Sequence, residues 1–209
     1  MDNYNFLEKL FHQIFLENSF LKKNIYEFEK FFFYKKNNES QNAKHIFITG
    51  MPRSGTTALL YFLYETNIFS SLTYRSMPLI MAPNFSKFLS KKNIKKKERY
   101  HSDNIFFDLN SPESFDEVFF SCFANDDLLV ELPKYVSLII KLHKKKRYLS
   151  KNNMNFKRID LISKAFPNSV FLIPFREPLQ HSFSLLSSHN HFVKLQKRDN
   201  FILDYMNYL

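Results

Sequence analysis

The fold is decided by the stretch His45-Ile46-Phe47-Ile48-Thr49-Gly50-Met51-Pro52-Arg53-Ser54-Gly55-Thr56-Thr57. The apolar run over 45–49 predicts a short buried strand, and the segment bounded by the two glycines predicts a turn. Residues 56–66 carry apolar side chains on one side of a predicted helix. A strand, a glycine-bounded loop and a helix in this order form the opening of a nucleotide-binding α/β unit.

Further strands and helices alternate along the rest of the chain. The apolar run Val170-Phe171-Leu172-Ile173-Pro174-Phe175 predicts a second buried strand, followed by a turn over 176–178 and a helix over 179–188. A short strand is predicted over 70–75, and helices over 111–123, 135–146 and 157–166. This alternation implies an α/β fold with a P-loop-like parallel sheet flanked by helices.

The N-terminal part is predicted to be a helical extension. Its apolar residues recur at steps of three and four: Leu7, Phe11, Ile14, Leu21, Ile25, Phe28 and Phe32. Asn18 and Ser19 form a candidate break with a new N-cap. We therefore expect a helical extension over 1–36 and a main domain over 44–209. The extension packs on this domain or, as the alternative, forms a coiled coil in a homodimer.

Composition favours some partners and excludes others. The net charge of +10 favours an anionic partner, but the 26 phenylalanines and two glycines indicate a compositional bias that explains part of this charge. The single cysteine, Cys122, excludes an intrachain disulfide. No signal peptide is visible, and no apolar run approaches the roughly 18 residues of a membrane span. We expect a soluble, cytoplasmic protein.

The loop between the two glycines predicts an anion site. It keeps the glycine spacing of the phosphate loop G-x-x-x-x-G-K-[ST], but Thr56 stands at the lysine position and the cation comes earlier, at Arg53. Backbone N–H groups at a helix N-terminus attract an anion, and Ser54, Thr56 and Thr57 add hydroxyl donors. The arginine can hydrogen-bond two oxygens of a phosphate or sulfonate group.

The second strand predicts another anion site. A kinase or triphosphatase needs a carboxylate at the end of a later strand for Mg²⁺. Here the strand over 170–175 ends in Arg176, which suits a second phosphate without a metal. Two cationic sites at the carboxyl ends of parallel strands describe a ligand with phosphates at both ends. His189 and His191 have no evident companion ligands, so we predict no metal site.

These residues resemble the sulfotransferase family that uses 3′-phosphoadenylyl sulfate (PAPS). The 5′-phosphosulfate loop of that family often reads P-R-S-G-T-T, which is complete here as Pro52, Arg53, Ser54, Gly55, Thr56 and Thr57. Its 3′-phosphate site is an arginine at a strand end and a serine eight residues later, as in Arg176 and Ser184. Several members also have a sulfonate-contacting lysine where this chain has Lys151, ahead of Phe166-Pro167.

The resemblance covers residues 44–189 and implies a chemistry. A sulfonate group passes from PAPS to a hydroxyl or amine acceptor, without a metal. Arg53 and Lys151 would offset charge on the transferring group, and Arg176 and Ser184 would hold the 3′-phosphate. The acceptor cannot be read from the sequence; a carbohydrate or a lipid headgroup is our guess from the basic composition.

The sequence departs from the family in two places. Some members use a glutamate as general base beyond the loop arginine, but residues 72–76 contain no acid. The cytosolic branch uses a histidine, for which His101 is the candidate here. Many members also continue into a glycine-bearing basic segment that closes over the nucleotide. No glycine follows Gly55, so we expect a C-terminally truncated chain whose activity at this length is open.

Three alternatives remain. The first is a degenerate PAPS-binding fold without turnover. The second is a P-loop kinase or NTPase with a displaced cation, against which Thr56 argues. The third is a basic module that binds nucleic acid, suggested by the lysine runs over 91–99 and 144–147. The chain has no nucleic-acid motif, so we expect no nucleic-acid partner.

Overall fold

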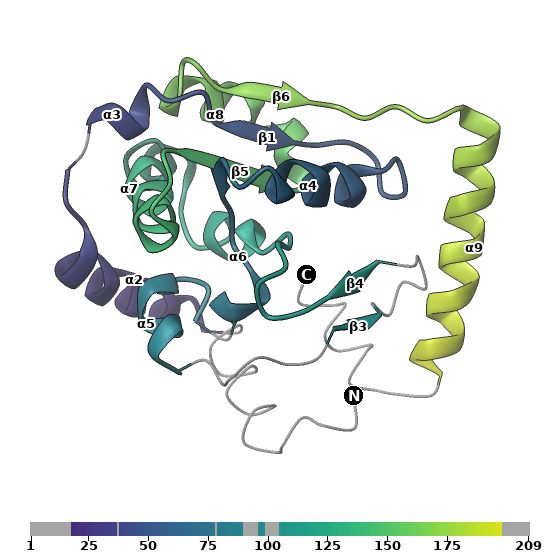
Figure 1. The fold of residues 1–209 in the computed structure, drawn as a ribbon, viewed down its shortest axis with the longest axis horizontal. Helices are drawn as coiled ribbons and strands as arrows, with labels where there is room; N and C mark the ends of the chain where they lie inside the picture. The colour runs from purple at the N-terminus through teal and green to yellow at the C-terminus, as the bar shows by residue number, and fades with distance from the viewer. Residues whose placement is uncertain (1–17, 37, 78, 90–95, 99–104, 198–209) are drawn as a thin grey trace.

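The protein has a parallel α/β fold (Figure 1). The computed structural model describes residues 18–36, 38–77, 79–89, 96–98 and 105–197. A four-stranded sheet has the order β2-β5-β1-β6, and its neighbouring strands are all parallel. Its strands are β1 (Ile46–Ile48), β2 (Phe69–Ser70), β5 (Arg147–Lys151) and β6 (Val170–Leu172). This confirms the predicted fold class. A separate antiparallel pair joins β3 (Lys97–Glu98) to β4 (Phe106–Phe107).

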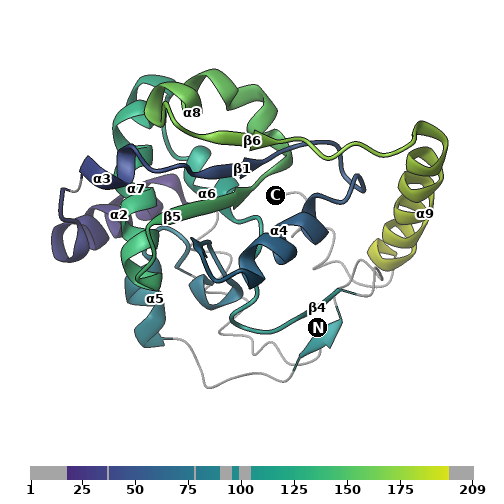
Figure 2. The same ribbon diagram turned by 45° about the horizontal axis from the view of Figure 1, so that its top comes forward.

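Two hydrophobic clusters cover the two faces of the sheet, because side chains alternate along each strand. Ile46 and Ile48 pack on one face with Leu60 of α4 (Thr56–Glu65). Phe47 points to the opposite face, which carries most of the core. That face is covered by α6 (Asp116–Phe120), α7 (Asn125–His143) and α8 (Ile159–Ala165). In both ribbon views α9 (Pro178–Gln196) stands apart from these layers (Figures 1 and 2).

The first described helix, α2 (Ser19–Phe33), buries a different face from the one predicted. Asn18 caps it as expected, accepting from two backbone N–H groups. However, Phe28 and Phe32 are 64% and 60% exposed, whereas Tyr26 and Glu29 are fully buried. Polar contacts explain why this face of α2 is buried. Tyr26 donates a hydrogen bond to Glu131 of α7. Glu29 accepts the backbone N–H groups of Asn84 and Phe85 in α5 (Pro83–Leu89).

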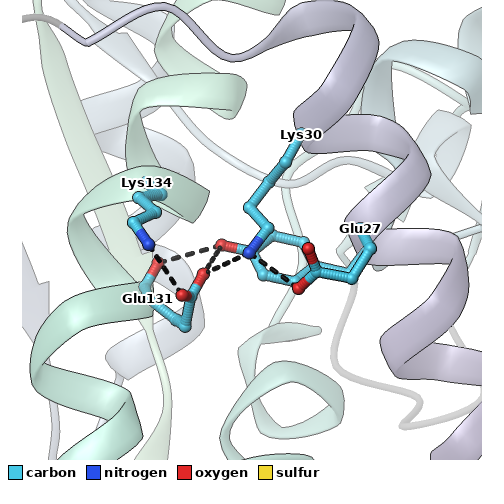
Figure 3. A network of polar contacts seen from close by, with 5 residues as sticks. Glu27, Lys30, Glu131 and Lys134 are labelled. Carbon is cyan, nitrogen blue, oxygen red and sulfur yellow. Dashed lines mark hydrogen bonds and ion pairs between the residues drawn. The ribbon is translucent and has the colours of Figure 1, made fainter.

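An ion-pair network also joins α2 to α7 (Figure 3). Glu131 forms ion pairs with Lys30 of α2 at 2.9 Å and with Lys134 of its own helix at 2.7 Å.

The division into residues 1–36 and 44–209 stays a prediction, and the first part of the predicted extension lies outside the described residues. Between α2 and β1 the chain forms the short helix α3 (Asn38–Gln41).

Several predicted elements have different bounds. The helix predicted over 111–123 is only α6, because Ser111 bonds Asp108 and does not act as an N-cap, while Pro112 pairs with Thr73 in an isolated bridge. The strand predicted over 70–75 stops at Ser70 and is followed by a 3-10 helix, Tyr74–Ser76. Another 3-10 helix, Asn153–Arg158, precedes α8. No helix in the described part of the chain is both long and apolar enough to cross a membrane.

Candidate active site

Three segments meet at the carboxyl edge of the sheet, where α/β proteins bind ligands. The strand register places Ile48 beside Lys151 on one side and beside Leu172 on the other. The loop over 49–55 therefore leaves the sheet between the end of β5 and the end of β6. Backbone hydrogen bonds continue past the strands, from Thr49 N–H to Leu172 O and from Asn152 N–H to Ile48 O, both at 3.0 Å.

The loop over 50–55 has the backbone of an anion-binding turn. Gly50 and Gly55 have φ of 145° and 98°, where other residues are strained. Gly55 is the N-cap of α4 and offers no side chain to its first N–H groups. These donors can therefore receive an external anion. Arg53 also has a positive φ of 68°, an unusual conformation for a residue with a side chain.

Helix α9 contacts this loop through Ser184, a predicted site residue, and through His181, which the sequence analysis did not single out. Arg53 Nε donates to Ser184 Oγ at 3.3 Å, although the two are far apart in the sequence. His181 is almost buried, and its Nε2 donates to Pro52 O at 2.7 Å. The structure thus brings the loop arginine and the proposed 3′-phosphate serine into direct contact. Ser54 Oγ donates to Met51 O at 2.8 Å, so it must rotate before it can donate to a ligand.

Arg176 lies on the extended segment that connects β6 to α9. Its side chain is exposed, as are those of Phe175 and Glu177 beside it. The Glu177 carboxylate accepts the N–H groups of Leu179 and Gln180 at 3.0 and 2.7 Å. These hydrogen bonds lower the pKa of Glu177. Glu177 therefore caps the N-terminus of α9. The neighbouring Arg176 carries the positive charge that can bind an anion.

Lys151 is the last residue of β5 and is half-buried. Leu149, two residues earlier, packs with Ile48 and Leu60 on the face that α4 covers. Since side chains alternate along a strand, Lys151 belongs to this same face. It therefore lies at the carboxyl edge of the sheet, on the side of the helix that begins at the phosphate loop.

Two residues that sequence reasoning did not single out support this edge. Asp116, which is 5% exposed, accepts hydrogen bonds from Tyr148 Oη and Ser150 Oγ. Burial raises the pKa of Asp116 to about 6. Burial acts the same way on Glu117, but hydrogen bonds from Arg158 and Asn152 outweigh it and lower the pKa. Two acids in the first turn of a helix look like ordinary dipole partners, so only their distant contacts identify them.

His101, the predicted general base, lies outside the described residues. The segment over 72–76 has no acid of its own, but Tyr74 Oη donates to Glu113 Oε2 at 2.9 Å, so an acid lies beside it. Among the residues that the structure describes, no three His, Cys, Asp or Glu side chains are grouped so that they could hold a metal ion.

Comparison with known proteins agrees with this geometry. A family model described as "Sulfotransferase family" matches residues 45–207. The match covers β1, the phosphate loop, β5, β6 and α9. Searches of curated proteins and of solved structures found no match. Because the family match spans most of the chain, the protein belongs to the sulfotransferase family.

Proposed function

We propose that this protein transfers a sulfonate group from PAPS to the hydroxyl or amine of an acceptor. Family membership supports sulfonyl transfer in general, and the site supports the donor. The observation that carries the proposal is the meeting of three strand ends at one edge. These strand ends lead into the Arg53 loop, Lys151 and the segment that carries Arg176. The loop itself has Thr56 where the phosphate loop of a nucleotide triphosphatase has a lysine.

The proposed donor fits the groups present at this edge. The first N–H groups of α4 have no side-chain cap, and they can donate to the 5′-phosphosulfate together with the hydroxyls of Thr56 and Thr57. Arg176 and Ser184 would hold the 3′-phosphate. Since Ser184 lies against Arg53, the two ends of the donor site are linked even before a ligand binds.

The residues at the edge would stabilise charge during transfer. When bound, PAPS supplies the sulfonate: the acceptor oxygen bonds to sulfur, the bond to the bridging phosphate oxygen breaks, and its electron pair leaves with adenosine 3′,5′-bisphosphate. Lys151 and Arg53 would offset the negative charge on the bridging and sulfonate oxygens. A base accepts the acceptor proton, and His101 is our candidate.

The acceptor class and the cellular location complete the proposal. A carbohydrate or a lipid headgroup is the acceptor class that we propose, and the cytoplasm is the proposed location. A homodimer and the absence of a nucleic-acid partner also stay predictions.

Calorimetric titration with adenosine 3′,5′-bisphosphate tests the donor site. We expect micromolar, metal-independent binding that is lost in Arg53→Ala. The matched control is Arg147→Ala, at the opposite end of β5, where the side chain bonds Lys44 O. Tight binding of ATP with Mg²⁺ and none of the bisphosphate would instead select the kinase alternative. Binding without transfer of radiolabelled sulfonate to any of a panel of carbohydrate and lipid acceptors would select the degenerate fold.

A further inference from the structure

The strand that carries Lys151 is held from its other face by a buried acid. Tyr148 and Ser150 point to the α6 side of the sheet, and both donate to the carboxylate of Asp116. The small gap beside this carboxylate is lined mostly by aromatic side chains and has no room for a water molecule. These buried hydrogen bonds hold the strand directly before its last residue.

The residues after Lys151 are held by the next acid of the same helix. Asn152 Nδ2 donates to Glu117 Oε2 at 2.7 Å. The guanidinium of Arg158 forms a two-pronged pair with the same carboxylate, at 2.9 and 2.6 Å. Arg158 also lies over the ring of Phe120, 4.4 Å from its centre. Such paired, charged hydrogen bonds fix orientation as well as distance.

The segment that Glu117 holds is in turn bonded to the start of the phosphate loop. Asn152 N–H donates to Ile48 O at 3.0 Å. The hydroxyl of Thr49 donates to Asn153 O at 3.1 Å and accepts from Phe156 N–H at 2.9 Å. A continuous set of hydrogen bonds therefore runs from α6, through residues 152–158, to the residue before Gly50.

We propose that the acidic pair, Asp116 and Glu117, positions Lys151 for sulfonate transfer. This inference rests on the proposed function. The pair contacts the residues on both sides of Lys151 from the opposite face of the sheet, so it acts through β5 and does not touch the donor. Displacement of a reacting group by about 1 Å can cost about a hundredfold in rate, which is why such support matters.

A comparison with Glu131 separates positioning from simple stabilisation. Glu131 has a similar network, with Tyr26, Lys30 and Lys134, but this network ties α2 to α7 (Figure 3). Glu131→Gln should therefore lower the melting temperature without changing turnover. Glu117→Gln should lower turnover about tenfold or more, while the bisphosphate dissociation constant changes no more than about twofold.

A double-mutant cycle tests whether Glu117 acts through Lys151. In a Lys151→Ala background, Glu117→Gln should cause no further loss of turnover. Unchanged turnover in Glu117→Gln, or the same loss in both backgrounds, would overturn the proposal. If Glu117→Gln does not fold, Arg158→Lys serves in its place, because lysine keeps the charge but loses the two-pronged geometry.

Hydrogen exchange tests the same contacts without any activity. In Glu117→Gln the amides of Asn152 and Phe156 should exchange about tenfold faster than in the wild type, since the bonds that protect them depend on the held segment. Glu131→Gln should leave these amides unchanged. Unchanged exchange in Glu117→Gln would refute the inference, whereas a wild-type protein that does not bind the bisphosphate would refute the proposed function alone.

Discussion

Stability between pH 4 and 6.5 should depend on two buried groups that act in opposite directions. His45 is completely buried; its Nε2 donates to Ser40 O at 2.6 Å, and its Nδ1 accepts Tyr148 N–H at 2.9 Å. Burial lowers the pKa of His45 from 6.5 to about 4. Protonation of Nδ1 would also place an N–H donor against Tyr148 N–H. Asp116 is the opposite case, because its burial raises the pKa from 3.8 to about 6.

The sign of each contribution follows from which state binds more protons. The unfolded protein binds the His45 proton more tightly, so this contribution is complete above pH 6.5 and is lost as the pH falls toward 4. The folded protein binds the Asp116 proton more tightly, so this contribution is complete below pH 4 and is lost as the pH rises toward 6. At 1.36 kcal/mol per pKa unit, each amounts to about 3 kcal/mol.

Urea denaturation at several pH values, followed by circular dichroism, measures both contributions. Asp116→Asn should make the free energy of unfolding rise more steeply with pH, because the His45 contribution is then unopposed. His45→Gln should change the slope the other way, so that stability falls as pH rises relative to the wild type. Other carboxylates contribute equally to the pH dependence of the wild type and of each variant, so their contributions cancel when a variant profile is compared with that of the wild type. Variant profiles parallel to that of the wild type would refute the reasoning.

Three further predictions concern the proposed site and the attachment of α2. Arg176→Ala should weaken adenosine 3′,5′-bisphosphate by about 1.5–3 kcal/mol and change adenosine 5′-phosphate little, as calorimetry can show; equal losses for the two ligands would remove the 3′-phosphate assignment. Lys151→Ala should reduce turnover far more than donor affinity, and unchanged turnover in a sulfonate-transfer assay would eliminate it as a sulfonate contact. Tyr26→Phe should lower the free energy of unfolding by about 1 kcal/mol, because it removes the hydrogen bond to Glu131 but keeps the ring packing. No change in its urea midpoint would contradict that attribution.

Local patterns in the sequence were sufficient for the strand, loop and helix that define the fold. The predicted strand over 45–49 is β1, and the predicted helix over 56–66 is α4. The run over 170–175 contains β6, although the strand ends at Leu172. These elements could be predicted because each depends on neighbouring residues: an apolar run, a glycine with positive φ, a helical period. The family resemblance, carried by the same short motifs, is confirmed.

The roles assigned to individual site residues are a different case. Neither the structure nor the comparisons test the roles of Arg53, Lys151, Arg176 and Ser184, and these stay predictions. What the structure adds is their arrangement, above all the contact of Arg53 with Ser184. That contact could not be read from the motif, because it depends on where α9 lies.

Tertiary structure alone decided β5, the buried face of α2 and the acidic pair. The strand Arg147–Lys151 follows a lysine run and has no long apolar stretch, so its pairing with β1 and β2 is what identifies it as a strand. Phe28 and Phe32 complete an apolar helical stripe in the sequence, yet Tyr26 and Glu29 are the residues that find partners on other helices. Asp116 meets Ser150 across 34 residues of chain. A sequence pattern records the period of a segment, whereas burial of a polar group is settled by hydrogen-bond partners that only the folded chain brings within reach.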